Sequence, residues 1–121
     1  MEIPESLKLG TTVLSVSVTE PIEFYNREDY LLVELNPQGN VPIYRTRKTI
    51  TRFLDKGKKP VALRGYGPRG ISTTAVIAHL IKVEEEGNWE FYFETFSARN
   101  PKGEKQMTGL QVVLLPITES K

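Results

Sequence analysis

Two apolar patterns alternate along this chain, and their order constrains the fold more than any other sequence feature. In residues 11–18 every second residue is apolar from Leu14 onward, which is typical of a strand with one buried side. Residues 30–36 give a second, more apolar strand pattern. From residue 43 to residue 56 the apolar residues recur at helical spacing instead. This change of period predicts helices that pack on a sheet.

The second half of the chain repeats the change. Residues 60–63 read as a short strand, and residues 71–86, before Gly87, as a helix whose wide apolar side predicts deep burial. Residues 88–97 alternate between aromatic and polar side chains, and residues 110–117 form a last apolar strand. The order is strand, strand, helix, strand, helix, strand, strand. We therefore expect an α/β fold, an α+β sandwich in which two helices cover one mixed sheet.

Charge is unevenly distributed over the 121 residues, although the formal net charge is only +1. Residues 1–42 carry two basic and seven acidic side chains, whereas residues 43–70 carry nine basic and one acidic. Such a block predicts a strongly positive face on a nearly neutral protein. Part of it is a helical stripe of basic residues at spacings of three and four, namely Arg45, Lys48, Arg52 and Lys56.

The stretch "RGYGPRGISTT" at residues 64–74 contains the spacing G-x-G-x-x-G between Gly65 and Gly70. That spacing after a strand fits a dinucleotide-binding turn, but too few parallel strands follow for a cofactor domain. "RGYG" also begins the octapeptide of RNA-recognition strands, yet the next four residues depart from it, and Pro68 does not suit a central strand. We reject both motifs.

A phosphate-backbone site is the third interpretation of this stretch. Glycines let the main chain approach a ligand closely, and free N–H groups at a helix start favour anions near Ser72. Arg64 and Arg69 flank the turn. The alternative is a tight turn with both arginines in solvent; the neighbouring basic stripe favours binding.

The stretch from Pro42, "PIYRTRKTITRFLDKG", followed by a strand and "GYGPRGISTTAV", resembles the Alba superfamily of small DNA- and RNA-binding proteins. Gly67, Arg69, Ile71 and Ser72 are similar to that family's Gly-Arg-x-Ile-Ser turn, and the resemblance covers about residues 30–118. It implies a βαβαββ domain over residues 30–118. Residues 1–29 would then be an acidic N-terminal extension with one extra strand.

The resemblance further implies a non-catalytic protein that binds DNA, RNA or both through the phosphate backbone, as chromatin or ribonucleoprotein components do. It implies a homodimer, or a heterodimer with a relative. Contacts would come from Arg69 and from a basic hairpin arm with Arg99, Lys102 and Lys105. Together with the turn and the basic stripe, the candidate nucleic-acid contacts are Arg45, Lys48, Arg52, Arg64, Gly67, Arg69, Ser72, Arg99, Lys102 and Lys105.

The remaining residues argue against other functions. The chain has no cysteine and a single histidine, His79, so a zinc site and a catalytic triad are not expected; we expect no cofactor, and His79 to be packed. The aromatic residues Trp89, Phe91, Phe93 and Phe96 either stack bases or form core or interface. No signal peptide or membrane span is apparent, so we expect an intracellular protein. The alternative function is a protein-interaction subunit of an RNA-processing ribonucleoprotein particle.

Overall fold

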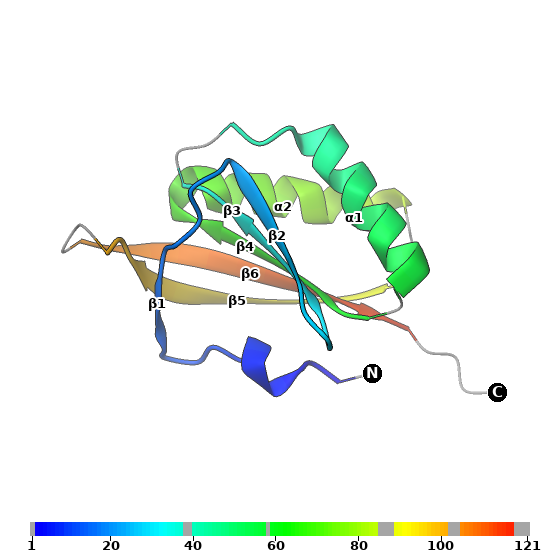
Figure 1. The fold of residues 1–121 in the computed structure, drawn as a ribbon, viewed down its shortest axis with the longest axis horizontal. Helices are drawn as coiled ribbons and strands as arrows, with labels where there is room; N and C mark the ends of the chain where they lie inside the picture. The colour runs from blue at the N-terminus through cyan, green and yellow to red at the C-terminus, as the bar shows by residue number, and fades with distance from the viewer. Residues whose placement is uncertain (1, 38–39, 58, 85–88, 102–104, 118–121) are drawn as a thin grey trace.

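A computed structural model describes residues 2–37, 40–57, 59–84, 89–101 and 105–117, and these form an α+β fold (Figure 1). A short 3₁₀ helix, six strands and two α-helices follow one another along the described chain: η1 (Glu5–Leu7), β1 (Val13–Ser15), β2 (Ile22–Asn26), β3 (Leu31–Leu35), α1 (Ile43–Gly57), β4 (Val61–Tyr66), α2 (Gly67–Glu84), β5 (Trp89–Arg99) and β6 (Gln106–Pro116). The α/β class expected from the sequence is confirmed.

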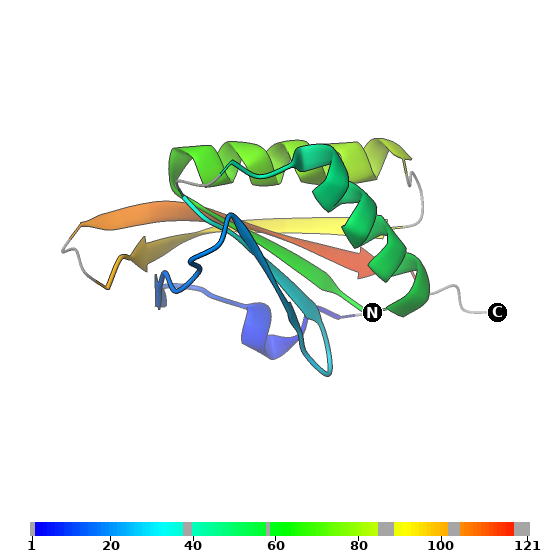
Figure 2. The ribbon, with the colours of Figure 1, turned by 45° about the horizontal axis from the view of Figure 1, so that its top comes forward.

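The strands form one mixed sheet in the order β1-β5-β6-β4-β3-β2. The neighbouring strands β3 and β4 are parallel, and β6 is antiparallel to both β4 and β5. The two strands of the N-terminal extension, β1 and β2, lie at opposite edges. Both α-helices cover the same face of this sheet (Figure 2). The segment β3-α1-β4-α2-β5-β6 therefore has the expected βαβαββ order.

The face of the sheet under the helices holds an apolar core. Its buried residues come from both helices and three strands: Leu31, Val33, Leu35, Ile50, Leu54, Val61, Leu63, Ile77, Ala78, Ile81, Val112 and Leu114. On α1 the buried positions Thr46, Ile50 and Leu54 recur at spacings of four. They follow one side of the helix, as the sequence pattern predicts.

The opposite face of the sheet is covered by the beginning of the chain. Leu7 packs with Leu32, Ala62 and other residues that point away from the helices. Leu9 packs with a second group of residues on the same side, which includes Tyr66 and Phe96. The described part of the extension is thus built into the sheet rather than loosely attached to it.

Several boundaries differ from the sequence prediction; β4, for example, continues to Tyr66, three residues past the predicted end. The extension contains two strands rather than one, because β2 occupies residues 22–26, where Pro21 and charged residues suggested a break. This strand lies at a sheet edge, where exposed polar side chains are tolerated. Helix α2 begins at Gly67 rather than at residue 71, since Pro68 is acceptable in a first helical turn. Strand β6 begins at Gln106, four residues before the predicted start.

The outer side of α2 is less buried than the sequence predicts. Its buried residues are Gly67, Gly70, Thr74, Ile77, Ala78 and Ile81. The valines Val76 and Val83 are exposed, at 41% and 63%. His79 is exposed too, so the expectation that it is packed was wrong. The helix uses one narrow apolar stripe against the sheet and leaves other apolar residues on its surface.

Candidate nucleic-acid interface

The stretch with the glycine spacing is the junction between β4 and α2. A Cβ atom on Gly65 would lie 2.0 Å from the carbonyl oxygen of Gly70, so the two glycines allow strand and helix to touch. Gly67 has φ +72°, a conformation that favours glycine. The close approach that Gly65 and Gly70 permit is therefore used inside the protein rather than against a ligand.

Arg69 and Ser72 lie in the first turns of α2, and both residues are exposed. The partial positive charge of a helix start adds to the charge of an arginine there. Gly67, the first residue of α2, is buried and lies close to Pro37 and Met107. Because Met107 belongs to β6, the start of α2 lies beside the β5–β6 hairpin.

The far part of this hairpin forms the expected arm. Figure 1 shows the adjoining ends of β5 and β6 reaching past the start of α2. Arg99 is exposed at the end of β5 opposite Gln106, and Lys105 is exposed just before β6. Lys102 lies outside the described residues. We call the set Arg69, Ser72, Arg99 and Lys105 the arm end.

A second basic surface lies on α1. Arg45, Lys48 and Arg52 are exposed on the side of the helix away from the buried positions, so the predicted stripe is present for these three residues. The side chain of Lys56 lies outside the described part of the helix. We call Arg45, Lys48 and Arg52 the α1 stripe.

The arm end and the α1 stripe lie toward opposite ends of α2. Arg47 forms an ion pair with Glu84, which ties α1 to the last turn of α2. Figures 1 and 2 likewise show α1 crossing over the far half of α2, away from the hairpin tip. The stripe and the arm end are therefore two separate surfaces rather than one continuous surface. Sequence analysis missed Arg47, because its partner is distant in the chain.

Arg64 does not flank the turn with Arg69, as the sequence suggested. It is buried on the face of the sheet away from the helices, and its Nε donates to Oε1 of Gln111 at 2.7 Å. Glu34 and Tyr66 lie buried on the same face, where the Tyr66 hydroxyl donates to Glu34. Burial, followed by this hydrogen bond, raises the pKa of Tyr66 above its usual range.

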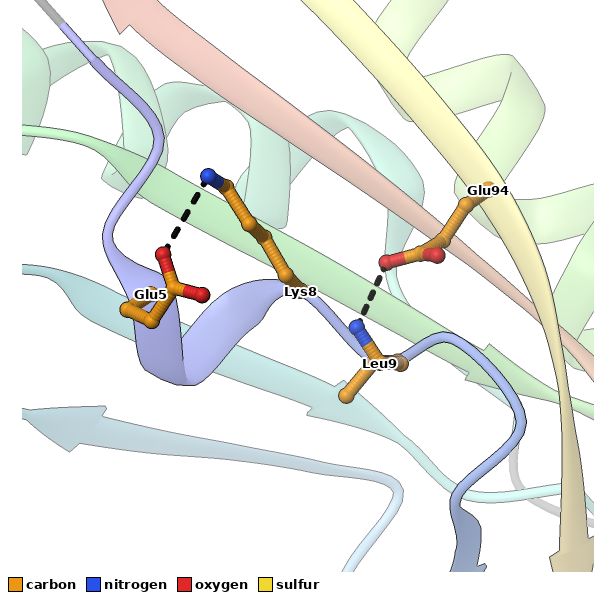
Figure 3. Close-up of polar contacts among 4 residues, drawn as sticks. All are labelled: Glu5, Lys8, Leu9 and Glu94. Atoms are coloured by element: carbon orange, nitrogen blue, oxygen red, sulfur yellow. Dashed lines mark hydrogen bonds and ion pairs between the residues drawn. The ribbon is translucent and has the colours of Figure 1, made fainter.

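This buried cluster (Glu34, Arg64, Tyr66 and Gln111), which we call the polar cluster, is closed by the N-terminal segment. Nε2 of Gln111 donates to the carbonyl oxygen of Leu7 at 2.7 Å. Next to it, Glu94 accepts a hydrogen bond from the amide of Leu9 at 2.9 Å (Figure 3). It also accepts one from the amide of Gly10 at 3.4 Å. The arginine is thus part of how the extension is fastened to the sheet.

The aromatic residues of β5 do not form one platform for stacking bases. Trp89 and Phe91 pack against the core under the helices. Phe96 points to the other face and is buried, with its ring 5.5 Å from that of Tyr66. Phe93 alone of the four is largely exposed, at 75%.

Comparison with known proteins gives no family. No protein-family model matches the chain, and no curated protein matches it either. Among the described residues, no group of three or more histidine, cysteine, aspartate or glutamate residues could hold a metal ion. Neither described α-helix is long and apolar enough to span a membrane.

Proposed function

We propose that this protein binds DNA or RNA without catalysis, through the phosphate backbone, with the arm end as its main contact. The observation that carries the proposal is the position of Arg69. It is an exposed arginine in the first turn of α2, beside a hairpin that carries Arg99 and Lys105. A helix start and a cluster of arginine and lysine residues both attract phosphate.

The α1 stripe is the second contact surface in this proposal. Its three side chains are exposed, and they lie on the same side of the sheet as the arm end, because both helices cover that face. A nucleic acid long enough to follow α2 would contact both surfaces. Contacts of this kind position a protein without reading bases, so we expect low sequence specificity.

In this proposal the protein binds as a homodimer or as a heterodimer with a relative, as the resemblance to the Alba superfamily implies. A second copy would double the number of phosphate contacts on one strand. Every phosphate contact adds to the slope of log K against log salt. The affinity of a dimer would therefore depend more steeply on salt concentration than that of a monomer.

The test is a titration of fluorescein-labelled duplex DNA, single-stranded DNA and hairpin RNA with the full chain. Binding is measured by fluorescence anisotropy at several KCl concentrations. We expect binding at low salt, with a slope of about −0.9 in log K against log salt for each phosphate neutralised on duplex DNA. We also expect similar affinity for scrambled sequences of one length. Absence of binding to all three nucleic acids at low salt would refute the proposal.

A further inference from the structure

The outer edge of β5 is open over most of its length. Strand β1 pairs with β5 only at Ser97–Arg99, and no other described strand pairs with its outer side. Residues 89–96 of this edge therefore offer backbone groups to a further strand. Long open edges are uncommon in natural sheets, where they are usually shortened, charged or covered.

The direction of the backbone groups follows from one hydrogen bond. The carbonyl oxygen of Arg99 accepts from the amide of Val16, on the outer side of β5. Since N–H and C=O groups point the same way in one residue and alternate along a strand, Phe91 and Phe93 also direct theirs outward. Glu90, Tyr92 and Glu94 direct theirs toward β6.

The side chains on the helix side of this edge are apolar, and an added strand would cover them. Phe93 is exposed, and beside it lies a groove of about 340 Å³ on the helix side of the sheet. Apolar atoms dominate its lining, which comes from α2, β5 and β6 and includes Ala75, His79, Phe91 and Leu110. An edge with outward hydrogen-bonding groups and an apolar groove along it fits an added strand.

We infer that a second copy of this chain pairs with this edge, β5 to β5 and antiparallel, with Phe91 opposite Phe91 on the two-fold axis. This inference specifies the interface of the dimer in the proposed function and rests on that proposal. The interface includes none of the nucleic-acid contacts. The pairing covers Trp89–Phe93 of each copy. It joins the two sheets into one, with all four α-helices on the same side.

Charge and the position of β1 favour this register over three neighbouring ones. A two-fold axis at Tyr92 would set Glu90 opposite Glu94 of the second copy, and one at Glu90 would set that residue opposite itself; like charges directly opposite are unfavourable. An axis at Phe93 would set Trp89 opposite Ser97, whose outer side β1 already occupies. With the axis at Phe91, no carboxylate faces another.

The same register brings complementary side chains together. Trp89 of each copy lies opposite Phe93 of the other, which covers the exposed ring with an aromatic partner. Glu90 lies opposite Tyr92, whose hydroxyl already donates to Glu90 of its own chain at 2.6 Å. The self-complementary edge satisfies what a symmetric dimer requires.

The first test is sedimentation equilibrium of the chain without nucleic acid. We expect a dimer, and we expect Tyr92→Glu, which sets two carboxylates opposite each other, to raise its dissociation constant by more than about tenfold. Tyr44→Glu is the matched control: Tyr44 is 72% exposed on α1, away from this edge, and its substitution should leave the dimer unchanged. A wild-type monomer at all concentrations, or a dimer that Tyr92→Glu leaves intact, would overturn the inference.

The second test fixes the register, and the absence of cysteine from the chain makes it unambiguous. Oxidation of the double variant Glu90→Cys/Tyr92→Cys should give a covalent dimer, because residues opposite in a non-hydrogen-bonded pair lie about 4.5 Å apart at Cα. The double variant Glu90→Cys/Glu94→Cys should stay monomeric on a non-reducing gel. The reverse pattern would overturn the register. Since both tests omit nucleic acid, their failure is separate from a failure to bind DNA or RNA.

Discussion

The two faces of the sheet are buried in different ways. Under the helices the buried core is apolar and is formed by elements that follow one another in the chain. On the other face a polar cluster is buried, and its cover comes from the N-terminal segment, which lies 104 residues from Gln111 in sequence. The buried residues of the helix-side core all belong to the βαβαββ segment, whereas the other face is also covered by the extension.

The comparison also bears on function. A sheet face that is covered by the N-terminal segment does not offer its aromatic residues to bases, as open-sheet RNA-binding domains do. The proposed binding therefore uses the helix side of the sheet, where the arm end and the α1 stripe lie.

The helix-side core should respond most strongly to truncation. Ile50 is fully buried between α1 and the sheet, so Ile50→Ala should lower the free energy of unfolding by about 2–5 kcal/mol. Urea unfolding followed by circular dichroism measures this. Tyr44→Ala, at an exposed position of the same helix, is the control and should change the stability little. A loss below that range would mean that α1 is loosely packed.

The polar cluster should respond to the loss of a hydrogen-bonding partner. Gln111→Leu keeps the volume but leaves the Arg64 Nε and the Leu7 carbonyl without their partner. We expect a loss of about 1–3 kcal/mol in the free energy of unfolding. We also expect faster hydrogen exchange in residues 7–10, which this side chain helps to hold. Unchanged exchange there would contradict the proposed fastening of the extension.

The pH dependence gives the next smaller effect. Because the pKa of Tyr66 is raised in the folded protein, its contribution to stability is complete below pH about 10, the unfolded value, and is lost as the pH rises through the folded value. The wild type should lose about 1 kcal/mol more than Tyr66→Phe between pH 10 and pH 11. Parallel stability curves for the two proteins would show that Tyr66 is not held neutral by its surroundings.

The smallest effect is expected at Glu94. Glu94→Gln weakens the acceptor of the Leu9 and Gly10 amides at a partly exposed position, and should cost about 0.5–1 kcal/mol (Figure 3). Lys8→Ala removes only an exposed ion pair with Glu5 and should cost less. Native-state hydrogen exchange of the Leu9 amide distinguishes them. Equal protection in both variants would count against Glu94 as an anchor.

Sequence reasoning succeeded where the determining interactions are local. The period of Ile43, Ile50 and Leu54 predicted α1, and its exposed basic side followed from the same geometry. It failed where a distant segment decides the outcome. Arg64 alternates with buried apolar residues along β4, so it lies on the opposite face of that strand. That this face is also buried follows from the N-terminal segment, where Leu7 bonds to the Arg64 partner Gln111.

The separation of the arm end from the α1 stripe could not be predicted either. Arg69 is close to the α1 stripe in sequence, but their distance in space depends on how α1 crosses α2. That crossing is marked by the contact of Arg47 with Glu84, a pair that sequence spacing does not indicate. The position of Arg69 at the start of a helix after a strand, in contrast, was evident from the glycine-rich stretch.

The most direct test of the central claim compares Arg69→Ala with Lys8→Ala in binding to one duplex DNA and one hairpin RNA over a range of KCl concentrations. Lys8 is exposed and belongs to the N-terminal segment that covers the other face of the sheet, so it reports the effect of losing one surface charge away from the proposed site. We predict that Arg69→Ala weakens binding to every sequence alike and lowers the salt slope by about one unit, while Lys8→Ala binds as the wild type does. Equal affinities and slopes for the two variants would contradict the assignment of the arm end as the nucleic-acid contact.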